Sequence, residues 1–206
     1  VDFKNGDTMK EPPHPIMVAD KVRHVGDAVA LVVAEDRFTA KDASELVKVD
    51  YEVLDAVVDP KAATEDGAPL VHDDVPNNTI YDFELGNKDE TDAAFENADK
   101  VIELSYHNQK LVPNAMEPRA ALAQYDANEE KYTLYTTSQN PHLARLVIGA
   151  FVLSIPEHKL RVISPDVGGG FGSKIFVYND ECGVLWASKQ LGRPVKWTAD
   201  RSEAFI

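Results

Sequence analysis

The chain has 206 residues, of which 44% are hydrophobic, and its 35 acidic and 21 basic residues give a net charge of −14. A chain of this length and composition can bury a hydrophobic core in one or two domains. The negative charge repels nucleic acid and anionic lipid, and no apolar stretch approaches the ~20 residues of a membrane span. We therefore expect a globular protein without nucleic-acid partners and without a membrane span.

The termini indicate whether the chain is a fragment, and the single cysteine indicates its cellular compartment. The sequence has no initiator Met and ends in TADRSEAFI, just after a predicted helix start, so we expect a fragment of a longer protein. Cys182 lies in the apolar run CGVLWASKQLG, which favours a core thiol over a nucleophile. A single cysteine excludes an internal disulfide and argues against an iron–sulfur cluster held by this chain. We expect a reducing compartment, the cytoplasm.

Strand and helix patterns alternate in the first sixty residues. The runs VGDAVALVVA and KVDYEVLDAVVD predict strands, and the intervening DRFTAKDASELVKV has helical spacing with Asp36 as its N-cap. From Pro60 to about Asp82 the sequence is rich in Pro, Gly, Asp and Asn, which predicts a long connection between two units. We interpret His72–Asp74 in this connection as solvated rather than metal-binding.

The second unit alternates in the same way. ETDAAFENA predicts a helix, KVIELSYHNQ a strand, and RAALAQYD with KYTLYTTS a hairpin. Asn140 and Pro141 begin a helix, HKLRVIS is a strand, and VYNDECGVLWASKQLG is a helix closed by Gly192. Strand-to-helix connections therefore stand at 138–141 and 166–174. Because helix N-termini offer free backbone N–H groups to anions, we expect one ligand site fed by both connections.

The second connection contains VGGGFGSK, which holds four of the eleven glycines. Neither common phosphate loop fits, because the dinucleotide fingerprint requires Gly where Ser173 stands, and the Walker motif requires Ser or Thr where Ile175 follows Lys174. The glycines could serve only a tight turn. Consecutive glycines cost backbone entropy, however, so we favour the close approach of a ligand.

Four motifs occur together in one order and spacing: PNAMEPRAALAQYD, TTSQNPHLAR, SPDVGGGFGSK and GRPVKWTADRSE. They resemble the molybdenum-binding large subunit of the xanthine dehydrogenase, aldehyde oxidase and carbon monoxide dehydrogenase family. DKVRHVGDAVALVVAEDRFTAKDASELVKVDYEVLDAVVD resembles the α/β hammerhead domain of that family. The resemblance implies an α+β chain with a partial α/β hammerhead domain at 1–64, a linker at 65–81, and the first part of a molybdopterin-binding domain of mixed strands and helices at 82–206.

The resemblance also implies a molybdopterin cofactor with molybdenum, often in its cytosine dinucleotide form. In the family, the glutamine matching Gln139 hydrogen-bonds an oxygen ligand of molybdenum, and the residues matching Gly170, Phe171 and Gly172 lie against the metal and the pterin. We therefore expect Gln139, Gly169, Gly170, Phe171 and Gly172 to bind the cofactor. Gln139 and Phe171 would stand nearest the molybdenum without being its ligands, and Phe171 would keep the metal centre dry.

The family reaction inserts a water-derived oxygen at carbon and passes electrons to iron–sulfur and FAD partner subunits. The family's base is a glutamate far towards the C-terminus, expected beyond Ile206, so this fragment alone would be inactive. We interpret Glu117, beside Arg119, as part of a structural ion pair and Glu181 as a helix residue, not as the base. The implied partners are the iron–sulfur subunit, the FAD subunit, the rest of the large subunit and a small-molecule substrate.

One position narrows the range of possible substrates. Purine-oxidising members carry a glutamate where Ile175 stands in this substrate-pocket position, and an isoleucine cannot hydrogen-bond a purine. Aldehydes and aromatic N-heterocycles stay open, and so does carbon monoxide, whose copper-binding cysteine would lie outside this chain. KIFVYNDECGVLWASK looks closer to the aldehyde-oxidising branch. Two alternatives are a non-catalytic nucleotide-binding module and a scaffold subunit on the same fold.

Overall fold

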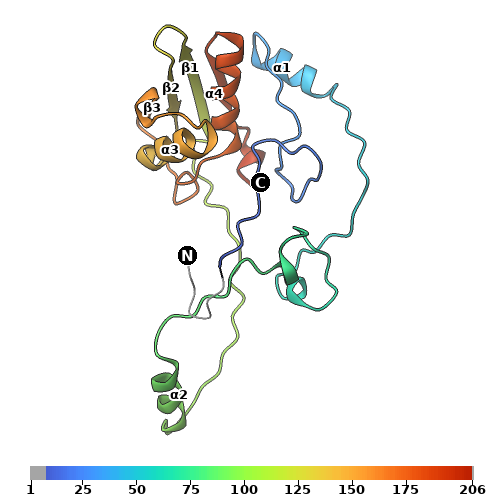
Figure 1. Cartoon of the computed structure of the whole chain (residues 1–206), viewed down its shortest axis with the longest axis vertical. Coiled ribbons are helices and arrows are strands. Elements are labelled where there is room, and N and C mark those ends of the chain that lie inside the picture. The colour runs from blue at the N-terminus through green and yellow to red at the C-terminus, as the bar shows by residue number, and fades with distance from the viewer. Residues whose placement is uncertain (1–7, 206) are drawn as a thin grey trace. The chain divides into compact units, whose positions relative to one another are not determined.

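The computed structural model describes residues 8–205, which fall into two compact units. One unit comprises the described residues up to His14 together with Asp50–Lys110, and the other comprises Pro15–Val49 together with residues 111–205. Helices and strands are mixed along the chain, as the α+β class requires (Figure 1). Among the described residues no helix is long and apolar enough to cross a membrane.

The second unit is built on a four-stranded sheet with the order β3-β2-β1-β4. β1 (Ala120–Asp126) and β2 (Lys131–Thr136) form the predicted antiparallel hairpin. β4 (Val195–Thr198) pairs antiparallel with β1, and β3 (Leu160–Ile163), which the sequence also predicts, pairs parallel with β2.

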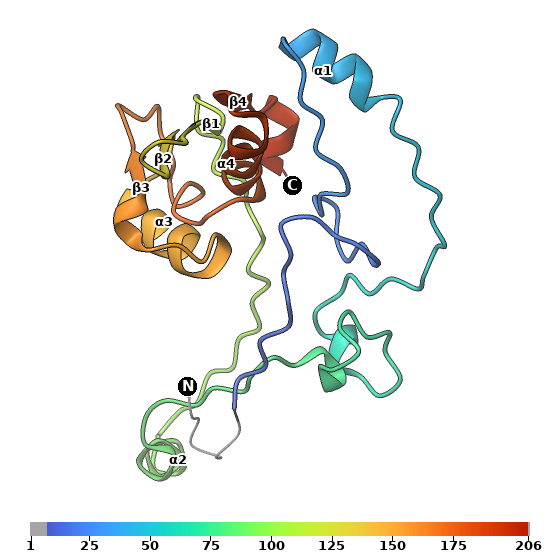
Figure 2. The ribbon, with the colours of Figure 1, turned by 45° about the horizontal axis from the view of Figure 1, so that its top comes forward.

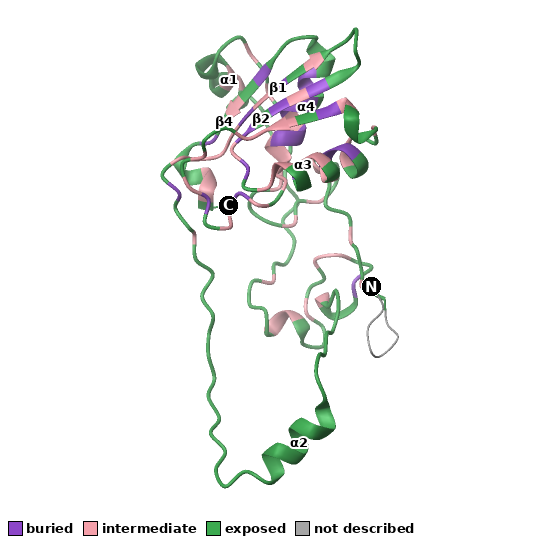
Figure 3. Cartoon of the chain, turned by 90° about the vertical axis from the view of Figure 1, so that its left-hand side faces the viewer, coloured by how far each residue is buried: buried purple, intermediate pink, exposed green. Residues whose placement is uncertain are grey.

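The helix α4 (Asn179–Leu191) packs against this sheet and contacts β1, β2 and β4. In β2 the residues Tyr132, Leu134 and Thr136 are buried in alternation, because successive side chains of a strand point to opposite faces. Figure 3 shows buried residues gathered on the strands and on the helices α3 and α4, whereas α2 is exposed. The core of this unit therefore lies between the sheet and its helices.

Helix termini follow the predicted signals. α3 (Pro141–Val147) begins at Asn140, whose side chain accepts a hydrogen bond from the Leu143 N–H at 3.3 Å, and it continues into a π-helical turn at Ile148–Val152. α4 ends at Gly192 in the left-handed conformation, with φ of 61°.

α1 (Arg37–Ser44) is capped by Asp36, as predicted. α2 (Lys88–Glu96) has Asn87 as its N-cap, so it begins just before the predicted helical segment ETDAAFENA and overlaps most of it. Short 3₁₀ turns occupy Ala62–Thr64, Pro76–Asn78, Glu157–Lys159 and Arg201–Phe205.

Three strand predictions are wrong for residues 8–205 of the structure. VGDAVALVVA, KVDYEVLDAVVD and KVIELSYHNQ are not strands, and the sheet of the described residues does not include them. A strand forms only where a neighbouring segment pairs with its backbone N–H and C=O groups. Many side chains of these segments are exposed, including Val53 at 91% and Tyr106 at 83%. The apolar runs have the amino-acid composition of strands, but composition does not determine whether another segment pairs with them.

The first prediction concerns the core of the second unit. Leu134 is fully buried in β2, so Leu134→Ala should lower the free energy of unfolding by about 2–5 kcal/mol through lost packing and a residual cavity. Leu191→Ala, at a position 52% exposed, is the matched control and should cost much less. Denaturant titration measures both changes, and equal losses would contradict this placement of the core.

Candidate cofactor-binding site

The candidate site lies where two connections leave the sheet of the second unit. β2 and β3 lie beside each other (Figure 2) and pair in parallel, so their carboxyl ends lie at the same edge of the sheet. The connection after β2 passes through Ser138 and Gln139 into α3, and the connection after β3 passes through Gly168–Lys174, here named the glycine loop, towards α4. The Ser164 hydroxyl donates to the Ser138 carbonyl oxygen at 2.6 Å and ties the two connections together.

Gln139 binds the glycine loop through its backbone and its side chain. Its N–H donates to the Lys174 carbonyl oxygen at 2.8 Å. Its side-chain Oε1 accepts from the N–H groups of Gly172 and Lys174 at 3.0 and 3.1 Å. The predicted convergence of Gln139 with the loop is therefore confirmed, by direct hydrogen bonds between the two connections.

These bonds fix which way the amide of Gln139 faces. Two backbone donors can only be matched by the amide oxygen, so Nε2 is left as the outward donor. Gln139 is exposed, and within residues 8–205 its Nε2 has no hydrogen-bond partner. The residue thus presents a positioned, uncharged donor beside the glycine loop.

Two glycines of the loop leave room for side chains of the chain itself. A Cβ on Gly170 would lie 2.3 Å from Oε1 of Gln139, and a Cβ on Gly168 would lie 2.6 Å from Cβ of Glu117. The sequence predicts the close approach of a ligand to these glycines. In the structure, the atoms that exclude a side chain at Gly168 and Gly170 belong to Glu117 and Gln139.

Other residues of the loop adopt the left-handed region of backbone space. Gly169 and Gly172 have φ of +95° and +94°, which glycine tolerates and most side chains do not. Phe171, between them, also has positive φ, 52°, and its side chain is 76% exposed. Phe171 thus carries an exposed aromatic ring in an uncommon backbone conformation, one residue before Gly172, whose N–H binds Gln139.

The loop also carries backbone donors that the fold does not use. In the described part of the chain, the N–H groups of Gly169, Gly170 and Phe171 have no hydrogen-bond partner. Successive free N–H groups in a loop of mixed φ sign form a concavity that binds anionic or carbonyl oxygens. Together with Nε2 of Gln139, they make a donor set suited to a ligand rich in oxygen acceptors.

Glu117 and Lys174 hold the base of the loop. Lys174 Nζ lies 2.9 Å from Glu117 Oε1, and the Lys174 side chain is only 2% exposed. Glu117 Oε2 accepts from the Gly168 N–H at 3.1 Å. Burial alone would raise the pKa of Glu117, but the hydrogen bonds from Lys174 and Gly168 and the Lys174 charge outweigh it and lower that pKa.

The predicted partner of Glu117 is wrong. Arg119 instead pairs with Asp180 at 3.2 Å, and its guanidinium lies 4.0 Å from the centroid of the Tyr178 ring. Residues two apart in extended chain share a face only when the backbone stays regular, and Glu117 lies in a bend before β1. No sequence motif indicates Lys174 as a site residue, because the Walker motif to which such a lysine could belong does not fit here.

Glu181 is a helix residue, as predicted. It is buried in the first turn of α4, where Oε1 accepts from the Thr136 hydroxyl and Oε2 from the Tyr178 N–H. Burial raises the pKa of Glu181. Both oxygens are engaged in holding α4 on β2, which supports a structural role.

Ile175 directly follows the glycine loop and is half-buried. Its N–H donates to the Gly172 carbonyl oxygen at 3.4 Å, so its backbone continues the turn of the loop. Its assignment to a substrate pocket stays a prediction.

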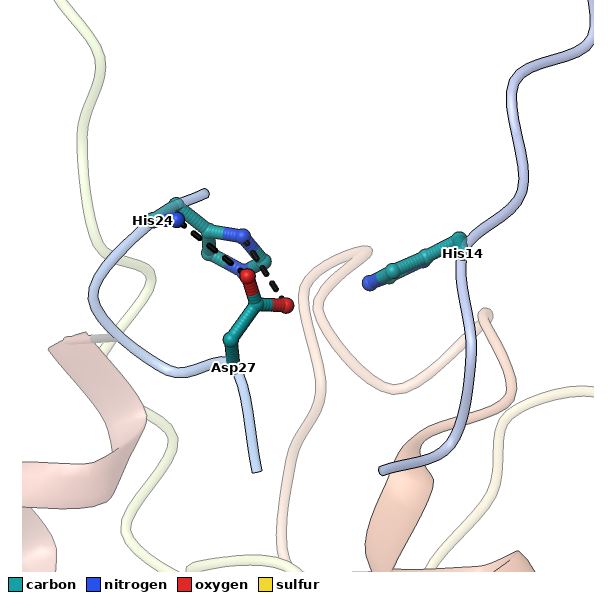
Figure 4. Close-up of side chains that lie close together, drawn as sticks. All are labelled: His14, His24 and Asp27. Atoms are coloured by element: carbon teal, nitrogen blue, oxygen red, sulfur yellow. Dashed lines mark hydrogen bonds and ion pairs between the residues drawn. The ribbon is translucent and has the colours of Figure 1, made fainter. Parts of the chain in front are cut away.

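A turn outside this site contains an ion pair. His24 and Asp27 lie 3.3 Å apart, and Asp27 also accepts from the backbone N–H of Arg23 at 2.6 Å (Figure 4). His14, also drawn in Figure 4, belongs to the other unit, so we assign no metal site to these residues.

Cys182 belongs to the core of the second unit. It is 3% exposed, and burial raises the pKa of its thiol to about 12. A thiol of this kind is protonated at neutral pH and out of reach of solvent, which supports a packing role over a nucleophilic one.

The second prediction tests this role. In the native protein at pH 8, Cys182 should react with a disulfide reagent such as DTNB only on the time scale of unfolding, because the thiolate is scarce and buried. The thiol should react fully in denaturant, which is the internal control. Rapid stoichiometric reaction of the folded protein would show that the thiol is accessible.

Comparison with known proteins places this chain in a family. Residues 71–206 match the molybdopterin cofactor-binding domain, and residues 2–55 match the a/b hammerhead domain of aldehyde oxidase and xanthine dehydrogenase. The chain belongs to the family of molybdenum-binding large subunits that includes xanthine dehydrogenase, aldehyde oxidase and carbon monoxide dehydrogenase. These matches confirm the family that the four motifs predict, and they confirm the α+β fold class.

Among curated relatives, the carbon monoxide dehydrogenase large chain of Afipia carboxidovorans is 39% identical over 200 residues, which cover 91% of this chain and 25% of that protein. The nicotine 6-hydroxylase large subunit of Paenarthrobacter nicotinovorans is 39% identical over 192 residues, covering 93% of this chain and 23% of that protein. The chain thus spans about a quarter of the length of these relatives.

Solved structures show the same likeness. Carbon monoxide dehydrogenase from Oligotropha carboxidovorans matches with a TM-score of 0.86 and 39% identity, over 92% of this chain and 25% of that one. Quinoline 2-oxidoreductase from Pseudomonas putida 86 matches with a TM-score of 0.84 and 34% identity, over 96% of this chain and 25% of that one.

Proposed function

We propose that this chain forms part of a molybdenum hydroxylase, which oxidises an aldehyde or an aromatic N-heterocycle with an oxygen derived from water. Each turnover would consume one water and release two protons and two electrons, which would pass to iron–sulfur and FAD partner subunits. The naming of the relatives as large chains and large subunits of their enzymes supports such an assembly. A single, buried cysteine supports a cytoplasmic location.

The donor set at the glycine loop carries the cofactor assignment. Nε2 of Gln139 and the free N–H groups of Gly169, Gly170 and Phe171 would suit a ligand with several oxygen acceptors, such as molybdopterin or its cytosine dinucleotide form. When bound, the cofactor supplies the redox centre that takes up the electrons of the substrate.

The residues of this chain would bind and orient rather than transfer protons. Gln139 would donate one hydrogen bond without ionising, Phe171 would cover the site with an apolar ring, and Gly172 would allow close approach because a Cβ there meets nothing within 4 Å. The carboxylates of Glu117 and Glu181 are engaged in structural bonds. The base would therefore come from outside these residues.

The substrate class rests on Ile175 and on the relatives. An isoleucine offers no hydrogen bond to a purine. Relatives named for nicotine and quinoline act on aromatic N-heterocycles by name, and an aldehyde oxidoreductase from Desulfovibrio gigas matches at 28% identity with a TM-score of 0.80.

We also propose the domain division of 1–64, 65–81 and 82–206, as hammerhead domain, linker and molybdopterin-binding domain. The two family matches, over 2–55 and 71–206, support the order of these domains.

The third prediction tests Gln139 in the complete enzyme. Gln139→Ala should keep most of the molybdenum and lower kcat by about tenfold or more, because it removes one orienting hydrogen bond and leaves the loop glycines in place. Gly170→Ala should lower kcat as well, because its Cβ would displace the Gln139 side chain. Metal analysis and steady-state kinetics measure both effects.

Gly149→Ala is the matched control, since a Cβ there lies 3.8 Å from its nearest neighbour, an ordinary contact. If Gly170→Ala acts only through Gln139, the double variant should resemble Gln139→Ala alone. If the Gln139→Ala enzyme kept full turnover and full metal content, the orienting role proposed for Gln139 would be contradicted.

The fourth prediction concerns the substrate. The complete enzyme should show a higher kcat/KM for an aldehyde or a quinoline-type heterocycle than for xanthine, because Ile175 leaves the polar groups of a purine unpaired. A preference for xanthine would refute this assignment while leaving the cofactor assignment intact.

A further inference from the structure

The ion pair of Glu117 with Lys174 joins the two ends of the glycine loop. The carboxylate binds Gly168, the first residue of the loop, through Oε2, and Lys174, the last residue, through Oε1. The Glu117 N–H also donates to the Gly168 carbonyl oxygen at 3.2 Å. One carboxylate therefore closes the loop into a ring of hydrogen bonds.

The ammonium of Lys174 depends on this one carboxylate. Its side chain is 2% exposed, and among the described residues Glu117 is its only side-chain partner. A buried ammonium that loses its partner is left with an uncompensated charge, so the Lys174 side chain would have to leave its place.

The backbone of Lys174 is at the same time the anchor of Gln139. Its N–H donates to Oε1 of Gln139 at 3.1 Å, and its carbonyl oxygen accepts from the Gln139 N–H at 2.8 Å. A movement of Lys174 would therefore release the bonds that turn Nε2 of Gln139 outward. Among the described residues, Glu117 forms hydrogen bonds only with Gly168 and Lys174. It has no hydrogen bond to Gln139.

We propose that Glu117 and Lys174 are positioning residues, whose ion pair holds the glycine loop closed and thereby fixes the Gln139 amide for the cofactor. The pair would act through Lys174 on Gln139, without contacting the cofactor itself. The part that concerns the cofactor rests on the proposed function, whereas the closure of the loop rests on the contacts alone.

The experiment has two readouts on the complete protein. Hydrogen–deuterium exchange of the peptide spanning 168–174, in protein prepared without cofactor, reports loop closure. Molybdenum content with kcat and KM, in protein prepared with cofactor, reports positioning. Glu117→Gln should speed exchange in this peptide by about tenfold or more and should lower kcat at little changed KM.

Two further variants guard against simple misfolding. Glu117→Gln/Lys174→Met removes both charges, so it leaves no unpaired buried ammonium, and it should fold while its loop still exchanges fast. Glu157→Gln breaks a different ion pair of the same unit, with Arg145 at 2.8 Å, and should leave both readouts unchanged. Exchange in peptides of α4 should stay slow in every variant.

A double-mutant cycle separates positioning from general destabilisation. In a Gln139→Ala background, Glu117→Gln should cause little further loss of kcat, because the residue on which it acts is gone. Additive losses would overturn the positioning role. Unchanged exchange in Glu117→Gln would overturn loop closure. A wild-type complete protein without molybdenum would overturn the proposed function and the positioning role with it, whereas the exchange data would still decide loop closure.

Discussion

The parallel pairing of β2 with β3 is the constraint from which the site follows. Parallel strands send their carboxyl ends to one edge, so the connection before α3 and the glycine loop before α4 must meet there. The hydrogen bonds of Gln139 to Gly172 and Lys174 form only because of this meeting. The burial of Leu134 and Leu160 on these two strands is what holds the edge in place.

The glycine loop shows how a site can be shaped by what it excludes. Gly168 and Gly170 lack side chains because Glu117 and Gln139 occupy the space that a Cβ would need. Those side chains accept hydrogen bonds from N–H groups near the two ends of the loop, at Gly168, Gly172 and Lys174, and the N–H groups in its middle stay free. The N–H groups that bind Glu117 and Gln139 are thus satisfied within the protein, whereas the middle N–H groups can still donate to an oxygen-rich ligand.

Local signals in the sequence predict most of the helices and the hairpin. Asp36, Asn140 and Gly192 mark helix ends at the observed residues, because caps depend only on neighbours in sequence. The runs around Leu31 and Val53 do not form the predicted strands, since strand pairing depends on distant segments. The convergence of Gln139 with the loop was predictable from the order of strands and helices. The bond of Glu117 to Lys174 was not, because 57 positions separate the two residues and no local pattern links them. The division into domains and the roles of the site residues stay predictions.

The central claim is that the loop, with the amide of Gln139 turned outward, receives the molybdenum cofactor. A crystal structure of the complete protein with its cofactor tests it. We expect Nε2 of Gln139 at hydrogen-bond distance, about 2.9 Å, from an oxygen ligand of molybdenum, with Oε1 still bonded to the N–H groups of Gly172 and Lys174. Electron density for the cofactor away from the glycine loop, or a Gln139 amide turned so that Nε2 faces the loop, would contradict the account.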